Sequence, residues 1–543
     1  MKIRQKFDTD KVSIKEYLQG YGVEDVDRYL QFNTIEDDDN YDNMNEAIAL
    51  FKKHIKNNGK IGIVQDSDVD GLLSTSLFIS FVKEKYNIDV VPFFHNENPK
   101  SHGLQDKELC KRIKESDIDL LIIPDAQANY RLNKDIDIIV LDHHNNPSPY
   151  CNVLINCQFS PKVENKSASG TLVTWHFLHK LDENLAMKYI SYPAISIISD
   201  SMSFITCENA TFVHHGLKLE NIHKNLLPIL EKLQSSISRK TGERVWRLEN
   251  DNFAWGGIIP NANAVIRVGT LEQKQNMLKL FCGMLDGKEL KDTLSIFSEC
   301  KKEQTSQTED IMENHIKFEE MNENVLIAKL DIKTSITGLV ANKLQSKYHK
   351  PVLLVHDNNQ DEFQGSARSP YEIQSELRNS GFFTMADGHE HAFGVAYEKK
   401  REDEVKDYLY HHLTLSEPAY DVFTEETLNS LSNYLIDRFE PYKGLWGNDL
   451  PKPLYYIKNI KLSREEIIQM KGTIKFEKNE WTFIRFFTSQ DWIDENIKDN
   501  MIVDVIGYLQ YNEWNGNKTK QFVIEEIEIR EDNKATLFED LFG

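Results

Sequence analysis

Three aspartates at alternate positions constrain the fold of this chain more than any other feature. They stand in the stretch IGIVQDSDVDG, which begins at Ile61, and the helix-like segment LLSTSLFISFVKEKY follows. In an extended segment alternate side chains point the same way, so Asp66, Asp68 and Asp70 can share one face. Like charges held this close are costly unless something positive lies among them. A solvated turn or a helix N-cap would explain an isolated D-x-D pattern. The residues at the ends of the other predicted strands therefore decide between such a turn or cap and a site that binds a cation.

Short apolar runs alternate with helix-like segments after Lys60, which predicts a parallel α/β sheet. The runs are IGIV, DVVPFF, DLLIIP and DIDIIVL. Polar or acidic segments follow them directly, namely QDSDVDG, HNENPKSHG, DAQAN and DHHNN. In open α/β sheets the carboxyl ends of the strands form the ligand crevice, so we expect these loops to converge.

Carboxylates and imidazoles gather at these ends and predict a metal site. Asp125 follows LIIP, and Asp142, His143 and His144 follow IIVL, while Asp200 follows AISIIS at what we take as another strand end. Oxygen ligands with one or two imidazoles and no thiolate suit Mn²⁺ or Mg²⁺ better than a structural zinc. Two such ions ~3.5–4 Å apart, bridged by one carboxylate, would activate a water and clamp a phosphoryl oxygen.

The rest of the chain predicts further domains, because 543 residues exceed what one core usually holds. Residues to about 56 look helical and polar, with an acidic loop, IEDDDN, that we expect to be solvated. Residues from about 216 to 325 indicate a helical connector, and a second α/β segment follows at about 326–400. Period-two alternation over about 440–532, with the turn signal EWNGNK, favours a small OB-like β-barrel.

Composition narrows the class of protein. A net charge of −22 argues against non-specific adhesion to polyanions, but a local groove with bound divalent cations still permits a nucleic-acid enzyme. No apolar run has the length of a signal peptide or a membrane span, so we expect a soluble, cytoplasmic protein without a membrane partner. The six cysteines form no C-x-x-C pair and are expected to be buried, reduced thiols.

The ordered set DSDVDG, PDA, DHH and SD resembles the four motifs of the DHH phosphoesterases. The segments CENATFVHHGL and IIPNANAVIRVG are similar to segments of the RecJ single-strand exonucleases within that superfamily. GLVANKLQSKYHKPVLLV, GSARS and DGHEHAFG resemble the DHH-associated domain, and FEPYKGLWGNDLPKP and NEWNGNKTKQFVIEEIEI resemble the RecJ OB-fold domain. The resemblance covers nearly the whole chain from about residue 50.

This resemblance implies an α/β fold class and a domain order. We expect an N-terminal helical extension (1–50), a parallel-sheet DHH domain (51–215), a helical connector (216–325), a smaller α/β DHH-associated domain (326–405), a linker (406–440), an OB-like nucleic-acid-binding barrel (441–532) and a C-terminal tail (533–543).

The resemblance also assigns roles around the metals. The implied metal ligands are Asp66, Asp68, Asp125, His143 and Asp200, with Asp125 as the bridge between two Mn²⁺ or Mg²⁺ ions. Asp70 is either a further ligand or a partner behind the ligands. Asp142 would orient a neighbouring imidazole, as carboxylates behind metal-binding histidines do, and His144 would face the scissile phosphate. Asp70, Asp142 and His144 are therefore the expected catalytic residues.

A second set of residues is expected to hold the substrate. The set comprises Lys100, Arg267, Gly365, Ser366, Arg368, Ser369, Gly388 and His389. In GSARS, backbone amides, two hydroxyls and a guanidinium can hold a phosphate through a charge-assisted fork. Two departures from the family pattern stand out: Asp387 replaces a glycine, and NENPKSHGL lacks the usual arginine. Lys100 or His102 would have to replace that arginine, although lysine cannot form a bidentate fork, so an altered end preference is open.

The resemblance implies a 5′-to-3′ exonuclease that hydrolyses single-stranded DNA to 5′-mononucleotides in repair or recombination. The barrel tryptophans Trp481, Trp492 and Trp514 would offer stacking platforms for bases. The tail NKATLFEDLFG suits docking to a single-strand-binding protein or another replication or repair protein, and equally a frayed terminus. One alternative is a DHH phosphodiesterase for short oligoribonucleotides or cyclic dinucleotides, against which the extra barrel argues. Another is a non-catalytic replication scaffold.

Overall fold

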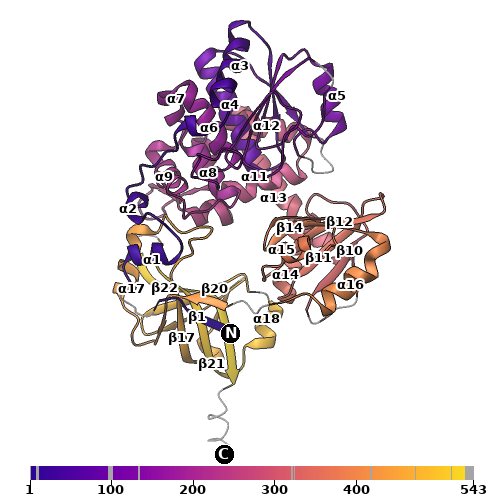
Figure 1. Cartoon of the computed structure of the whole chain (residues 1–543). Helices are drawn as coiled ribbons and strands as arrows, with labels where there is room; N and C mark the ends of the chain where they lie inside the picture. Colours follow the sequence, from indigo (N-terminus) through magenta and orange to yellow (C-terminus); the bar gives the residue numbers. More distant parts are fainter. Residues whose placement is uncertain are drawn as a thin grey trace, which may run out of the picture.

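A computed structural model gives the fold in three parts: an N-terminal α/β part with many helices, a smaller α/β part, and a β-rich part beside the N-terminus of the chain (Figure 1). The described residues are 2–7, 12–95, 102–132, 135–319, 322, 324–415, 419–470, 472–488, 490–514 and 517–531.

The first part contains a five-stranded parallel sheet in the order β3-β2-β4-β5-β6, as predicted. Its strands are β2 (Ile61–Gln65), β3 (Val91–Phe94), β4 (Leu120–Pro124), β5 (Asp137–Asp142) and β6 (Val153–Asn156). Every residue of β2 and β4 is buried, as a parallel sheet covered on both faces requires. The chain proceeds from β2 outward to β3 and then returns to β4 on the other side of β2, so the order reverses between β2 and β4. Ligands of open α/β sheets bind outside the carboxyl ends at such a reversal.

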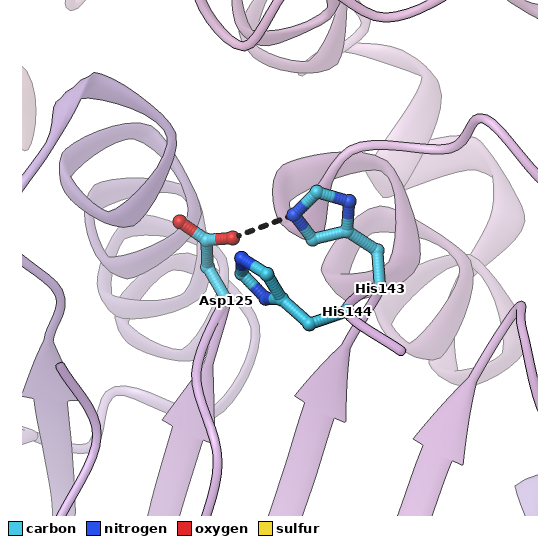
Figure 2. A group of neighbouring side chains, drawn as sticks. All are labelled: Asp125, His143 and His144. Carbon is cyan, nitrogen blue, oxygen red and sulfur yellow. Dashed lines mark ion pairs between the residues drawn. The ribbon is translucent and has the colours of Figure 1, made fainter. Parts of the chain in front are cut away.

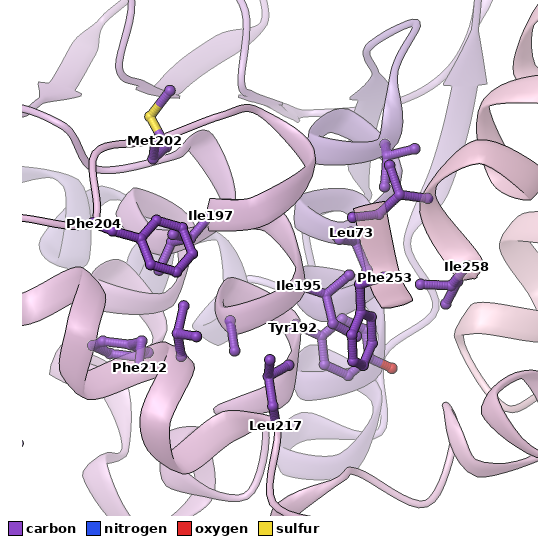
Figure 3. Packing of buried hydrophobic residues seen from close by; sticks show 14 of the residues in the cluster. Leu73, Tyr192, Ile195, Ile197, Met202, Phe204, Phe212, Leu217, Phe253 and Ile258 are labelled. Atoms are coloured by element: carbon purple, nitrogen blue, oxygen red, sulfur yellow. The ribbon is translucent and has the colours of Figure 1, made fainter. Parts of the chain in front are cut away.

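Helices pack a continuous apolar core beside this sheet. They include α4 (Val69–Tyr86), α6 (Gly170–Leu181), α8 (Ser191–Ser199), α9 (Cys207–Gly216) and α11 (Ile258–Val268). Figure 3 shows Leu73 of α4, Ile195 of α8 and Phe212 of α9 in that core. The segment AISIIS, expected to end a strand, lies in α8, so that expectation is wrong. An apolar run buried all round has no periodicity that separates helix from strand.

The N-terminal segment is partly helical, with α1 (Ile14–Gly20), α2 (Val26–Tyr29) and α3 (Met44–Lys56), but it begins with β1 (Lys2–Gln5). β1 pairs in parallel with β15 (Ala419–Val422), a strand within the predicted linker.

The acidic loop IEDDDN is not simply solvated, contrary to expectation, because the side chain of Asp38 is buried. Its Oδ1 lies 2.8 Å from Nδ1 of His176, and Nε2 of His176 lies 3.0 Å from Oε1 of Glu208. Burial alone would lower the pKa of His176, but the charge of Glu208 and the two hydrogen bonds raise it to about 9. The imidazole of His176 lies between two carboxylates and therefore ties the N-terminal segment to α6 and α9.

The connector carries α10 (Leu227–Leu233), the hairpin β7 (Ser235–Ile237) and β8 (Arg244–Trp246), α12 (Leu271–Phe281) and the long α13 (Gly287–Asn314). The smaller α/β part has a sheet in the order β13-β14-β12-β11-β10-β9. Its strands are β9 (Ile316–Phe318), β10 (Leu326–Leu330), β11 (Val352–Asp357), β12 (Glu362–Arg368), β13 (Met385–His389) and β14 (Ala392–Glu398), and its helices are α14 (Thr337–Tyr348), α15 (Gln374–Asn379) and α16 (Glu402–His411).

The β-rich part is a seven-stranded sheet in the order β16-β17-β21-β22-β20-β19-β18. Its strands are β16 (Thr424–Glu426), β17 (Leu454–Ser463), β18 (Ile468–Met470), β19 (Thr473–Lys478), β20 (Trp481–Phe486), β21 (Asn500–Trp514) and β22 (Asn517–Glu531), joined by α17 (Asn433–Asp437) and α18 (Gln490–Asn496). Trp481 is only 2% exposed, so its predicted role as a stacking platform is wrong. It alternates into the core, whereas Trp492 is partly exposed and stacks under Arg485 at 4.3 Å. The predicted C-terminal tail lies outside the described residues. Nowhere in the described chain is a helix both long and apolar enough to cross a membrane.

Candidate functional site

The predicted metal-binding residues converge at the carboxyl edge of the parallel sheet. Nε2 of His143 lies 3.1 Å from Oδ1 of Asp125, 3.4 Å from Oδ2 of Asp200 and 4.0 Å from Oδ2 of Asp70. Figure 2 shows the ring of His143 facing Asp125, with His144 beside both. Because Asp125 follows β4, His143 follows β5 and Asp200 ends α8, three elements meet at one point.

Two glycines make room for this convergence. A Cβ on Gly71 would lie 2.6 Å from Cβ of Asp66, and a Cβ on Gly170 would lie 2.5 Å from Oδ1 of Asp125. Asp125 itself has φ +57°, a left-handed conformation that aspartate and asparagine tolerate better than most residues. The motif DSDVDG already contains Gly71, but no pattern in the sequence marks Gly170.

Asp70 anchors helices, and its two predicted roles, a further ligand or a partner behind the ligands, both stay predictions. Its carboxylate accepts hydrogen bonds from the backbone N–H groups of Gly170 at 2.7 Å and Thr171 at 2.8 Å, and from the hydroxyl of Ser196 at 2.5 Å. These bonds join α4 to α6 and α8. Asp68 is the N-cap of α4 and accepts from the N–H of Gly71 at 3.0 Å, so the capping and metal-binding interpretations are compatible.

The donor set fits divalent cations. Three groups each have ligand atoms within 4.8 Å of one another: Asp125, His143 and His144; Asp70, His143 and Asp200; and Asp66, Asp68 and His102. Burial, followed by the charges of Asp70, Asp68 and the other aspartates, raises the pKa of Asp125 well above its usual value. Oδ1 of Asp125 and Nε2 of His143 are buried without a hydrogen-bond partner among the described residues. Buried polar atoms of this kind are costly unless a ligand satisfies them.

Asp142 lies within hydrogen-bond distance of His144, and its predicted role in orienting this imidazole stays a prediction. Nδ1 of His144 lies 2.7 Å from Oδ1 of the fully buried Asp142, whose Oδ2 accepts from Nε2 of Gln127 at 3.2 Å. Burial alone would lower the pKa of His144, but the hydrogen bond and charge of Asp142 raise it to about 9. The contact with Asp142 therefore favours the imidazolium form of His144. Burial and the charge of His144 together lower the pKa of His143.

Asp142→Asn should lower the pKa of His144 from about 9 towards the ordinary value of histidine, because it removes the main charge that favours the imidazolium. The stabilisation that this pair gives wild type is complete below the unfolded pKa of about 6.5 and disappears as the pH rises through the folded value. NMR titration of metal-free protein with ¹⁵N-labelled histidine measures the shift directly. A His144 resonance that still titrates near pH 9 in the variant would contradict this account.

Two guanidinium groups, of Arg267 in the connector and Arg368 in the smaller α/β part, lie close enough for their charges to interact. Arg267 of α11 donates from Nη1 to the carbonyl of Ser335 at 3.3 Å and lines a pocket of about 300 Å³. Burial lowers its pKa, an effect that the charge of Asp68 partly offsets. Burial and the charge of Arg267 lower the pKa of Arg368 to about 10. A Cβ on Gly338 of α14 would lie 2.5 Å from Nη2 of Arg368, so this glycine gives the guanidinium its space.

The other residues predicted to hold a substrate differ in their surroundings. Ser366 lies on β12 near Arg368, with its hydroxyl 3.5 Å from the position of a Cβ on Gly338. The backbone of Gly365 packs so closely on β11 that a Cβ would lie 2.0 Å from the carbonyl of Leu354. Ser369 is buried, and its hydroxyl accepts from the N–H of Tyr371 at 2.9 Å.

The segment DGHEHAFG, which carries the predicted substrate residues Gly388 and His389, begins on β13. Gly388 has φ +140°, and a Cβ there would lie 2.8 Å from Cα of Phe393. Asp387, the departure from the family pattern, pairs with Arg378 at 2.9 Å. Lys100 and the side chain of His389 lie outside the described residues. The substrate roles of this whole set stay predictions.

Comparisons with known proteins agree with this geometry. Residues 60–198 match the N-terminal domain of the DHH family, and residues 425–526 match the RecJ OB domain. In these two domains the chain is similar to the RecJ-type DHH proteins. It is 28% identical over 568 aligned positions to the SPbeta prophage-derived YorK of Bacillus subtilis (strain 168), whose name describes a single-strand DNA-specific exonuclease, with 94% of this chain and 95% of YorK covered.

Two RecJ proteins extend the comparison. The single-stranded-DNA-specific exonuclease RecJ of Bacillus subtilis is 23% identical, with 90% of this chain and 64% of that protein covered. The crystal structure of RecJ in complex with Mn²⁺ from Thermus thermophilus has the same fold, with a TM-score of 0.67 and 19% identity over 90% of this chain and 72% of that chain. The RecJ-like fold therefore extends beyond the two matched domains.

Proposed function

We propose that this chain is a metal-dependent exonuclease that hydrolyses single-stranded DNA from the 5′ end to 5′-mononucleotides in cytoplasmic DNA repair or recombination. The carrying observation is the meeting of Asp66, Asp68, Asp125, His143 and Asp200 at one sheet edge, where the charge of Asp68 also acts on Arg267. Names of its RecJ-like relatives support a single-stranded DNA substrate. The polarity and the products rest on the family resemblance.

The aspartates and His143 would hold two Mn²⁺ or Mg²⁺ ions, with Asp125 between them. Structures of the Thermus RecJ with Mn²⁺ and with Mg²⁺ support these metals. When bound, the ions supply a polarised water and neutralise charge on the scissile phosphate. His144, whose imidazolium form Asp142 favours, would donate a hydrogen bond to a phosphate oxygen. Arg267 and Arg368 would orient the strand by holding a phosphate between two guanidinium groups.

The OB domain would extend the contact along the strand. Arg485 lies over the ring of Trp492 at 4.3 Å, and Lys518 lies over Tyr511 at 3.8 Å. Such pairs of a cation and an aromatic ring combine phosphate attraction with a surface for base stacking. A substrate of two to five nucleotides has no need of this additional surface, which favours a long single strand.

Cleavage of matched oligonucleotides tests this proposal. Three 5′-phosphorylated 30-mers, with phosphorothioates at the 5′ end, at the 3′ end or nowhere, are incubated with protein and Mn²⁺, along with a blunt duplex. We expect release of mononucleotides from the unmodified and 3′-modified strands and little from the 5′-modified strand or the duplex. Asp125→Asn provides the inactive control.

Other outcomes identify the alternatives. Cleavage of the 5′-modified strand but not of the 3′-modified strand would reverse the polarity. Survival of all long strands with hydrolysis of diribonucleotides or a cyclic dinucleotide would indicate the small-substrate phosphodiesterase. Binding of the strand without cleavage of any substrate would indicate a scaffold, and a pull-down with single-strand-binding protein would then be the next step.

A further inference from the structure

Two histidines approach Asp66 from outside the set that the sequence assigns to metals. Nδ1 of His102 lies 2.6 Å from Oδ2 of Asp66, and Nε2 of His95 lies 3.7 Å from Oδ1 of the same carboxylate. The backbone N–H of Gly103 donates to Oδ1 at 3.2 Å. Asp66 is only 1% exposed, so this end of the carboxylate cluster is enclosed by protein.

His95 is the independent sign that this end of the cluster binds a ligand. It is 5% exposed, and neither of its ring nitrogens has a hydrogen-bond partner in the described part of the chain. A buried imidazole without partners is costly, and buried polar groups of this kind usually have a bound water or ion nearby. Its only charged neighbour within ion-pair distance, among the described residues, is Asp66.

The ligand atoms here are suited to one metal ion. An oxygen of Asp66, an oxygen of Asp68 and a nitrogen of His102 lie within 4.8 Å of one another. His102 is 42% exposed at its side chain, so it stands at the solvent side of the position, while His95 closes the buried side.

We propose that Asp66, Asp68 and His102 form the ligand set of one of the two metal positions, with His95 behind it as an acceptor or donor for a metal-bound water. This inference rests on the proposed function, because it assumes the two-metal site. Magnesium binds carboxylates and waters and gains little from imidazole, whereas Mn²⁺ accepts nitrogen ligands. His102 therefore makes this position selective for Mn²⁺ over Mg²⁺.

Manganese binding tests the inference without any measurement of cleavage. Metal-free full-length protein is titrated with MnCl₂, and the free Mn²⁺ is measured by its room-temperature EPR signal. We compare wild type, His102→Gln and the control His315→Gln. In wild type, Nδ1 of His315 lies 2.8 Å from Oδ1 of Asp331, so this control removes an imidazole beside an aspartate outside the metal site. We expect two Mn²⁺ per chain in wild type and in the control. In His102→Gln one of the two should bind about 10–100-fold more weakly, the range seen when support of a metal site is removed.

Two further readouts separate a ligand from a merely structural histidine. Pulsed EPR of the loaded protein should show ¹⁴N couplings from two kinds of imidazole in wild type and from one, assigned to His143, in His102→Gln. Magnesium should displace the second Mn²⁺ from the variant at about 10-fold lower concentration than from wild type, in line with the weaker Mn²⁺ binding.

The failures of the inference and of the proposed function differ. Unchanged Mn²⁺ affinity and unchanged ¹⁴N couplings in His102→Gln would overturn the assignment of His102 while leaving the two-metal site intact. A wild type that binds no Mn²⁺ would overturn both. If His102→Gln unfolds, His95→Gln serves as the second variant: weaker binding of one of the two Mn²⁺ ions supports the inference, and unchanged affinity for both ions contradicts it.

Discussion

Asp125→Asn is expected to lower kcat/KM on single-stranded DNA by at least about 100-fold, more than the 10–100-fold that loss of an outer hydrogen-bond partner costs. The same change should stabilise the metal-free protein. Burial and nearby aspartates raise the pKa of Asp125. At pH values between the pKa of Asp125 in the unfolded state, near 4, and its raised pKa in the folded state, only the folded state binds the proton. The free energy of unfolding of wild type therefore falls as the pH rises through this range. Thermal unfolding in EDTA from pH 5 to 8 should show this decline in wild type and a smaller one in the variant.

Asparagine is chosen at position 125 so that the variant and wild type differ in side-chain charge and not in backbone strain. At φ +57° alanine would add a left-handed strain of about 1–2 kcal/mol, which asparagine largely avoids. Asp137→Asn, at the opposite end of β5, is the matched control. Asp137 pairs with His54 at 2.7 Å and its pKa is lowered, so this variant should keep its activity and lose a little stability. Asp125→Asn that cleaves within 10-fold of wild type would refute the metal-binding role, and a variant that melts earlier than wild type in EDTA would refute the account of the raised pKa.

The sheet and its polar edge could be predicted because both have a local signal. Continuous apolar runs such as LLIIP mark strands buried on both faces, and an aspartate directly after each run marks the carboxyl edge. These local patterns were enough to bring Asp66, Asp125 and His143 to one place. The barrel likewise follows from period-two alternation, and the RecJ OB match includes it.

Other features depend on contacts between segments far apart in the chain. Asp38 is buried because His176, 138 positions later, meets it, and no local pattern announces that pair. Gly170 lies against Asp125 only after α6 packs on the sheet. The sequence offers His102 as a substitute for a missing arginine, but in the fold it contacts Asp66. Trp481 is buried although the sequence predicts an exposed ring, because alternation alone does not say which face of a barrel strand is the core.

Arg368→Gln is expected to lower kcat/KM for a 5′-phosphorylated strand by about 10–100-fold, since hydrogen bonds to charged groups contribute about 1.5–3 kcal/mol. A 5′-hydroxyl strand should be affected much less. Burial and the charge of Arg267 lower the pKa of Arg368 to about 10. An anionic 5′-phosphate would relieve the repulsion between these two guanidinium groups, and a 5′-hydroxyl would not, so the variant should affect the phosphorylated strand more. Single-turnover cleavage of matched 5′-phosphate and 5′-hydroxyl strands measures the ratio. Arg378→Gln, on the more exposed face of the same domain, is the control.

Arg267→Gln and the double variant decide whether both groups hold one phosphate. If they do, the losses should not add, because removing either guanidinium already breaks the two-sided grip, and residues that share a partner are coupled. The double variant should also unfold at a higher temperature than wild type when no nucleic acid is present, because the mutual repulsion is gone. Additive losses, or an unchanged preference for the 5′-phosphate in both single variants, would mean that Arg267 and Arg368 contact different parts of the strand.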